Sequence, residues 1–297
     1  MSVIQPKQEK TYSFDEKHIF DIKQVKEVLS YADQTRIDAG TRFLLEADEL
    51  IKRGKVNQSL AFYTKSIVAH PSANAYFGLG NANLALGMYE DAIDAYHMAE
   101  WLDYEPLSHI YYNLATAYSN DYTDLDGMNR AVKYLKQALE SGYDDRQHFM
   151  TNNQLKDYRY SEEYLDLFLK YFSNKDKAQR KQALFELFVN LFPRHELPFE
   201  IGVGDMNRDV EEGRLPISHR FYAFINQKAD KYVYASASTK AFFHLLVAET
   251  DNYIAVIYER EPKATNQQPV SNRKRSSYDI ATFNKSGVII DLSLIHI

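Results

Sequence analysis

The chain of 297 residues contains no cysteine, which excludes disulfide bonds, thiolate nucleophiles and cysteine-ligated metal sites within it. It also lacks a run of about 18 apolar residues, the length that a membrane-spanning helix needs. Its first residues have no apolar core of a secretory signal peptide, so we expect a cytoplasmic product. If the true start lies further upstream, a periplasmic or envelope-attached product stays open.

Positive charge is in the minority. The chain has 35 lysines and arginines against 41 acidic residues, for a net charge of −6. Residues 197–291 are balanced, so the excess of acid lies before them. An acidic surface repels phosphate, and we therefore expect no nucleic-acid partner. A hydrophobic content of 45% with 26% charged residues is typical of a globular chain rather than a disordered one.

A short pattern recurs at a fixed distance along the first half of the chain. Gly54 and Tyr63 return 33 residues later as Gly87 and Tyr96, and a looser third copy begins at Ala131. A period in the low thirties, with two helical patterns per unit, is typical of a solenoid of stacked helix pairs. Proteins built in this way hold another molecule in a groove.

Apolar spacing and helix-breaking residues predict three helix pairs in this region, with a leading helix before them and closing helices after them. Gly54 and Gly87 are predicted to take positive φ at the turns inside two of the pairs. The predicted helices are Thr41–Arg53 with Gln58–Ala69, Ala73–Leu86 with Tyr89–Leu102, Leu107–Asn120 with Asn129–Glu140, a leading helix within 16–34, and closing helices near 162–172 and 175–192.

The middle pair resembles one complete tetratricopeptide repeat (TPR), and the flanking pairs resemble more degenerate units over about residues 40–140. The residues that carry the resemblance are Leu79, Gly80, Asn83, Gly87, Tyr89, Ala92, Tyr96 and Ala99. The resemblance implies a right-handed superhelix. It also implies that the concave face, lined by the first helix of each pair, binds peptides or partner proteins.

Helical spacing maps a set of residues to that face as candidate partner-binding residues. Asparagine is a poor helix former, and a side-chain amide that both donates to and accepts from a peptide backbone would explain its presence. The alternative is that these are solvated helix residues. Phe77 and His109 stand where a carboxylate clamp of this family would need bases, so we expect no such clamp. The candidates are Asn74, Phe77, Asn81, His109, Tyr112, Asn113, Thr116 and Asn120.

From Leu197 the hydrophobic period changes to two, which predicts an antiparallel β-rich domain. Turn residues at 250–252 and 284–287 predict hairpins, and the final strands resemble a β-meander of many bacterial envelope proteins. The predicted strands are Phe199–Val203, Ile217–Ile225, Lys231–Ser236, Ala241–Glu249, Tyr253–Glu259, Tyr278–Phe283 and Val288–Asp291.

Residues 292–297 resemble the translation of an adapter used in sequencing libraries. We expect them to be foreign to the natural protein and the β-rich domain to be incomplete; a genuine apolar strand is the alternative. No catalytic set, metal site or cofactor site is predicted. The glycines at 202–204 fail the dinucleotide fingerprint, and the acids at 121–126 lack the spacing of a calcium loop.

The sequence thus predicts an α+β chain with a leading segment at 1–38, a TPR-like solenoid at 39–195 and a β-rich domain at 196–291. We expect a non-enzymatic scaffold that binds a protein or peptide in the concave groove. Two alternatives stay open: the adaptor part of an enzyme whose catalytic region lies beyond this sequence, and an envelope lipoprotein or assembly factor.

Overall fold

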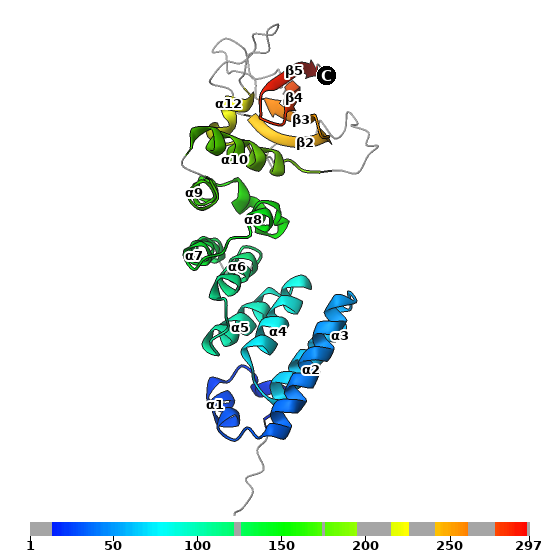
Figure 1. The fold of residues 1–297 in the computed structure, drawn as a ribbon, viewed down its shortest axis with the longest axis vertical. Helices are drawn as coiled ribbons and strands as arrows, with labels where there is room; N and C mark the ends of the chain where they lie inside the picture. The colour runs from blue at the N-terminus through cyan, green and yellow to red at the C-terminus, as the bar shows by residue number, and fades with distance from the viewer. Residues whose placement is uncertain are drawn as a thin grey trace, which may run out of the picture. The chain divides into compact units, whose positions relative to one another are not determined.

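The computed structural model describes residues 14–121, 126–173, 176–194, 215–225, 241–260 and 277–295. The chain divides into two compact units, Met1–Tyr143 and Asp144–Ile297. The first unit is helical, and the second joins helices to an antiparallel sheet, which confirms the predicted α+β class (Figure 1).

The first unit consists of TPR-like helical hairpins in sequence order, which confirms the predicted pairs. The hairpins are α2 (Gln34–Lys52) with α3 (Val56–Ala69), α4 (Ala73–Ala85) with α5 (Tyr89–Trp101), and α6 (Leu107–Tyr118) with α7 (Gly127–Glu140). They pack closely because the alanines at their seams, such as Ala92 and Ala131, are fully buried. Tyr96 and Leu135 fill the remaining space and are also fully buried.

The segment before the hairpins differs from the prediction of one leading helix over 16–34. It forms a short 3-10 turn, η1 (Glu16–His18), and a helix, α1 (Ile22–Ser30). The reason is capping: the side chain of Asp21 accepts hydrogen bonds from the backbone N–H groups at the start of α1, and Asp33 does the same for α2. The hydroxyl of Tyr76 on α4 donates to the carbonyl of Ile19, so this segment is fastened to the middle hairpin.

The turns inside the first two hairpins contain Gly54 at φ +70° and Gly87 at φ +74°, as predicted. No heavy atom lies within 4 Å of the position that a Cβ on Gly54 would occupy, so alanine there tests the backbone alone. We expect Gly54→Ala to lower the free energy of unfolding by about 1–2 kcal/mol and Gly54→Asn by less, because asparagine tolerates this region. Urea unfolding of both variants checks the order, and a Gly54→Ala protein as stable as the wild type would contradict it.

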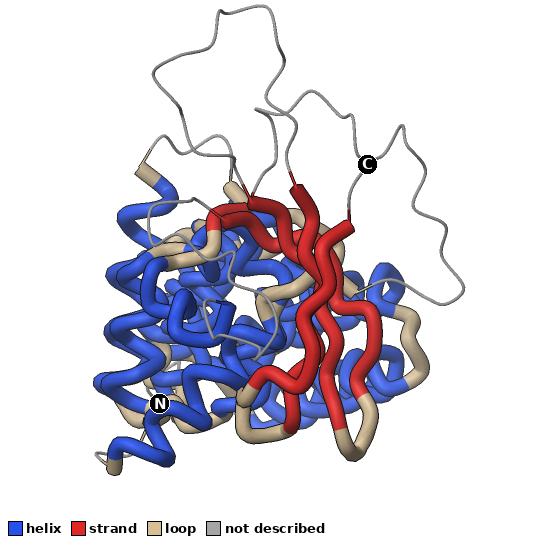
Figure 2. The backbone as a smooth tube through the Cα atoms, turned by 90° about the horizontal axis from the view of Figure 1, so that it is seen from above, coloured by secondary structure: helices blue, strands red, loops and turns tan. Residues whose placement is uncertain are grey.

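The second unit begins with helices and ends with a meander. Its helical elements are α8 (Arg146–Thr151), η2 (Asn153–Tyr160), α9 (Glu162–Tyr171), α10 (Lys177–Asn190), η3 (His219–Phe221) and α12 (Tyr222–Ile225). Its strands are β1 (Leu215–Pro216), β2 (Ala241–Glu249), β3 (Tyr253–Arg260), β4 (Ser277–Asn284) and β5 (Ile289–Ile295). In Figure 2 the strands lie side by side, and every paired strand in the described sheet is antiparallel to its neighbour in sequence.

Strands β2, β3 and β4 confirm three predicted strands, and the hairpin turns at Thr250 and Asn284 are confirmed with them. The predicted strand Ile217–Ile225 is wrong, because most of this segment is helical in η3 and α12. The side chain of Ser218 caps the backbone N–H of Arg220, and the buried residues that follow have helical spacing. The predicted strands Phe199–Val203 and Lys231–Ser236 lie outside the described residues.

The helices from Asp144 onward belong with the sheet, whereas the change of hydrophobic period predicted a boundary at 195/196. Phe188 on α10 explains the difference, because its ring lies 5.9 Å from that of Phe243 on β2 and 6.1 Å from that of Phe283 on β4. Strand β5 pairs with β4 as far as Ile295, so residues 292–295 are strand in this structure. That they are foreign to the natural protein stays a prediction.

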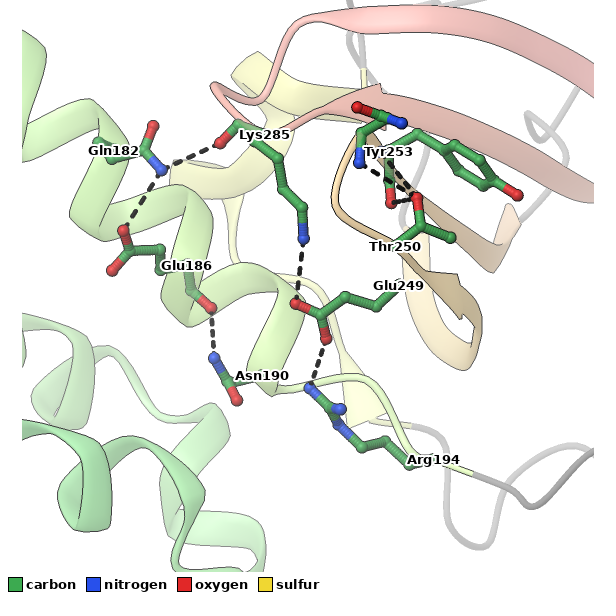
Figure 3. A network of polar contacts seen from close by, with 9 residues as sticks. Gln182, Glu186, Asn190, Arg194, Glu249, Thr250, Tyr253 and Lys285 are labelled. Atoms are coloured by element: carbon green, nitrogen blue, oxygen red, sulfur yellow. Dashed lines mark hydrogen bonds and ion pairs between the residues drawn. The ribbon is translucent and has the colours of Figure 1, made fainter.

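Polar contacts also tie α10 to the sheet (Figure 3). The side-chain amide of Gln182 on α10 donates to the carbonyl of Lys285 in the β4–β5 turn. The carboxylate of Glu249 at the end of β2 is shared by Arg194, at 3.1 Å, and Lys285, at 3.5 Å. Within the part of the chain that the structure describes, no helix is long and apolar enough to cross a membrane.

Candidate functional site

Two of the predicted residues meet at the centre of the first unit. The Nδ2 of Asn113 on α6 donates to the Oδ1 of Asn81 on α4 at 2.8 Å, and the hydroxyl of Tyr96 on α5 donates to the same oxygen at 2.9 Å. Both asparagines are half-buried. Among the described residues, neither the Nδ2 of Asn81 nor the Oδ1 of Asn113 has a hydrogen-bond partner. The pair therefore offers one free amide donor beside one free amide acceptor.

The same construction occurs one hairpin earlier. The hydroxyl of Tyr63 donates to the carboxylate of Asp48 at 2.8 Å, and these residues precede Tyr96 and Asn81 by 33 positions. Burial, and then the bond to Asp48, raise the pKa of Tyr63, while burial also raises the pKa of Tyr96. Both hydroxyls therefore stay protonated as donors at neutral pH. The first helices of the hairpins thus present a row of one carboxylate and two amides.

Aromatic pairs lie beside this row. The ring of Phe77 on α4 stacks on Tyr104 with 4.1 Å between the ring centroids and 20° between the planes. Tyr104 follows α5, and its backbone N–H donates to the carbonyl of Ala99 at 3.0 Å after Asp103 has turned the chain at φ +58°. Both rings of the pair are half-buried, so they combine apolar area with a fixed position.

A matching aromatic pair closes the third hairpin. Tyr143 follows α7, stacks on Tyr112 at 4.2 Å and meets the ring of His109 edge-on at 6.0 Å. Its backbone N–H donates to the carbonyl of Ala138 at 2.9 Å, after Gly142 has turned the chain at φ +91°. Two successive hairpins therefore use the same helix-ending turn to place a tyrosine against the preceding first helix.

The structure places the eight predicted residues in two groups. Asn74 and His109 are exposed, and Phe77, Asn81 and Asn113 are half-buried, so these five can be reached by a partner. The remaining three, Tyr112, Thr116 and Asn120, are each 1% exposed.

The three buried residues support the α6 helix instead of facing outward. The hydroxyl of Thr116 donates to the carbonyl of Tyr112 at 3.1 Å, and the side-chain amide of Asn120 donates to the carbonyl of Thr116 at 2.8 Å. The prediction placed these residues on the open face because helical spacing assumes that other parts of the chain pack against only one face of α6. In the structure a second face of α6 is also covered, for example by the ring of Tyr143 stacked on Tyr112. The accessible face is accordingly narrower than predicted.

Helical spacing along the first helices did not predict a role for Tyr96, Tyr104 or Tyr143. These tyrosines contact Asn81, Phe77 and Tyr112, respectively, and so fix the residues of this face. A usable signal was present for the last two: each tyrosine directly follows Asp103 or Gly142, a residue type that tolerates positive φ just after a helix. Within the described ranges, no three acidic or histidine side chains are grouped so that they could hold a metal ion.

Comparison with known proteins gives one structural likeness to report. No protein-family model matches the chain, and no curated protein matches it. Among solved structures, the chain is similar to YrrB, described as a TPR protein with an unusual peptide-binding site. The two are 24% identical, the match covers 56% of this chain and 79% of that one, and the TM-score is 0.39.

Proposed function

We propose that the first unit is a non-enzymatic scaffold that binds an extended segment of a protein partner across α4 and α6. The observation that carries the proposal is the unused pair of amide groups, the Nδ2 of Asn81 and the Oδ1 of Asn113. An extended peptide presents one carbonyl acceptor and one N–H donor per residue, which is the complement of that pair. The bond between the two asparagines fixes their orientation before the partner arrives, which lowers the entropy cost of binding.

The chemistry of the face favours an internal segment of the partner over a terminal carboxylate. The row of polar groups on the first helices holds Asp48, Asn81 and Asn113, none of which is cationic. A free carboxylate would meet no opposite charge there, whereas a basic side chain near Asp48 would. The stacked rings of Phe77 and Tyr104 offer an apolar contact of the kind that dominates peptide interfaces.

The proposal can be tested with peptides that are selected from a display library for binding to the full chain. The affinity of each selected peptide is then measured separately. We expect Asn113→Ala to weaken their binding about tenfold, or ~1.4 kcal/mol, because it removes the acceptor for the peptide N–H. The variant keeps the bond between Tyr96 and Asn81, so the hairpins should stay folded. Fluorescence polarisation gives the affinities, and circular dichroism checks the helical content.

Asn57→Ala is the matched control, because Asn57 is an exposed asparagine on α3, outside the proposed face. Its peptide affinity should equal that of the wild type. Equal affinities for Asn113→Ala and the wild type would refute the role of the amide pair.

A further inference from the structure

The second unit contains a cavity of about 700 Å³ at the carboxyl-terminal ends of α8 and α10. Its described lining includes two arginines and several amides and hydroxyls but no acidic side chain. One wall is apolar, formed by the half-buried residues Tyr160, Pro193 and Leu215. The cavity is thus both positively charged and partly hydrophobic.

The more deeply placed arginine is Arg159, which is only 4% exposed. Its Nη1 donates to the side-chain oxygen of Asn153 at 2.6 Å. Its Nη2 donates to the carbonyls of Met150, at 2.5 Å, and Asn190, at 3.0 Å. Its Nε is buried and has no partner among the described residues.

All of these partners are neutral, so the charge of Arg159 meets no carboxylate in the described part of the second unit. A guanidinium cannot release its proton in a protein, and a buried charge without a counter-ion is unfavourable. The carbonyls at the ends of α8 and α10 supply partial negative charge, which explains why the side chain is tolerated there. They also hold the guanidinium in one fixed orientation at the cavity wall.

Besides Arg159, the rim of the cavity also carries an excess of positive charge. Arg194 lines the cavity, and it shares the single carboxylate of Glu249 with Lys285 (Figure 3). Two cations and one anion leave one unit of positive charge beside the opening. Together with Arg159, the region carries two positive charges that the described acidic residues do not balance.

We propose that this cavity binds a small organic anion whose carboxylate or phosphate group pairs with Arg159 and whose apolar part lies against Tyr160, Pro193 and Leu215. Arginine suits both kinds of anion because its N–H groups form charge-assisted hydrogen bonds with carboxylate and phosphate oxygens. The volume falls in the range of ordinary small-molecule sites, and the mixed lining matches theirs.

Isothermal titration calorimetry of the full chain with four small-molecule probes tests the proposal. Benzoate and phenyl phosphate carry the charge and an apolar ring, inorganic phosphate carries the charge alone, and benzyl alcohol carries the ring alone. We expect saturable one-to-one binding of benzoate or phenyl phosphate, with weaker binding of the other two probes. Arg159→Gln should weaken binding at least about tenfold, because it removes the charge that pairs with the anion.

The control is Arg180→Gln, which removes an exposed positive charge from α10 outside the cavity lining and should leave binding unchanged. Arg194→Gln tests the rim without touching the buried network and should weaken binding several-fold. The proposal is overturned if the wild type binds neither charged aromatic probe, or if Arg159→Gln binds as well as the wild type. If circular dichroism shows that Arg159→Gln does not fold, unchanged binding by Arg194→Gln overturns it instead.

Discussion

Replacing Phe188 with alanine should lower the free energy of unfolding of the second unit by about 3–5 kcal/mol, because the side chain is a large ring in a rigid aromatic cluster. Phe188 is fully buried on α10. Its ring centroid lies between 5.0 and 6.1 Å from those of Phe192, Phe221, Phe224, Phe243 and Phe283. These neighbours come from η3, from α12, from two strands and from the residues just after α10, so they cannot all move inward to fill the space that alanine leaves.

Hydrogen exchange followed by mass spectrometry measures this effect separately for each unit. Amides of β2, β3 and β4 should lose protection in Phe188→Ala, while those of α4 and α6 keep theirs. Tyr253→Ala is the control, because Tyr253 lies on β3 but is 40% exposed, and it should cost about 1 kcal/mol or less. A Phe188→Ala protein with wild-type protection in the sheet would show that the aromatic cluster does not hold α10 to it.

Gly80→Ala is expected to destabilise the first unit by about 1–3 kcal/mol, although glycine to alanine inside a helix usually stabilises by about 1 kcal/mol. A Cβ on Gly80 would lie 2.6 Å from the nearest ring carbon of Tyr96. That ring is fully buried, and its hydroxyl is bonded to Asn81, so it cannot move away without losing the bond. The overlap therefore outweighs the gain in helix propensity.

The reverse substitution Ala61→Gly, at an exposed position inside α3, shows the normal propensity effect, with an expected loss of about 1 kcal/mol. Denaturant unfolding gives both values. In a Tyr96→Leu background the cost of Gly80→Ala should shrink, because the clashing ring is gone. A stabilising Gly80→Ala, or an unchanged cost in that background, would contradict the explanation.

Local signals account for what the sequence predicted well. The hairpins of the first unit follow from apolar spacing, from turn glycines such as Gly54 and Gly87, and from small residues at the seams. Strands β2 to β4 follow from alternation between clear turn residues such as Thr250 and Asn284. The prediction for Ile217–Ile225 was wrong because, over so short a segment, its apolar residues fit the period of two of a strand as well as the period of 3.6 of a helix. The hydrogen bond that the Ser218 side chain accepts from the backbone N–H of Arg220 favours the helix.

Tertiary contacts account for what the sequence could not predict. Spacing identified Asn81 and Asn113, but it could not show that they bond to each other or that Tyr143 covers Tyr112. The cavity at Arg159 depends on carbonyls that α8 and α10 bring together from positions far apart in the chain. No motif marks such a meeting point, because each residue taken alone is ordinary.

The order of the strands has a consequence for how the second unit folds. Since strands β1 to β5 of the described sheet lie in the order of the sequence, each new strand can pair with the strand that was made before it. The loops to be closed are then short compared with those of a sheet that interleaves distant strands, and contacts close in sequence favour rapid folding. A sheet of this kind can grow one hairpin at a time, as the chain emerges during synthesis, on the aromatic face of α10 that is made before it.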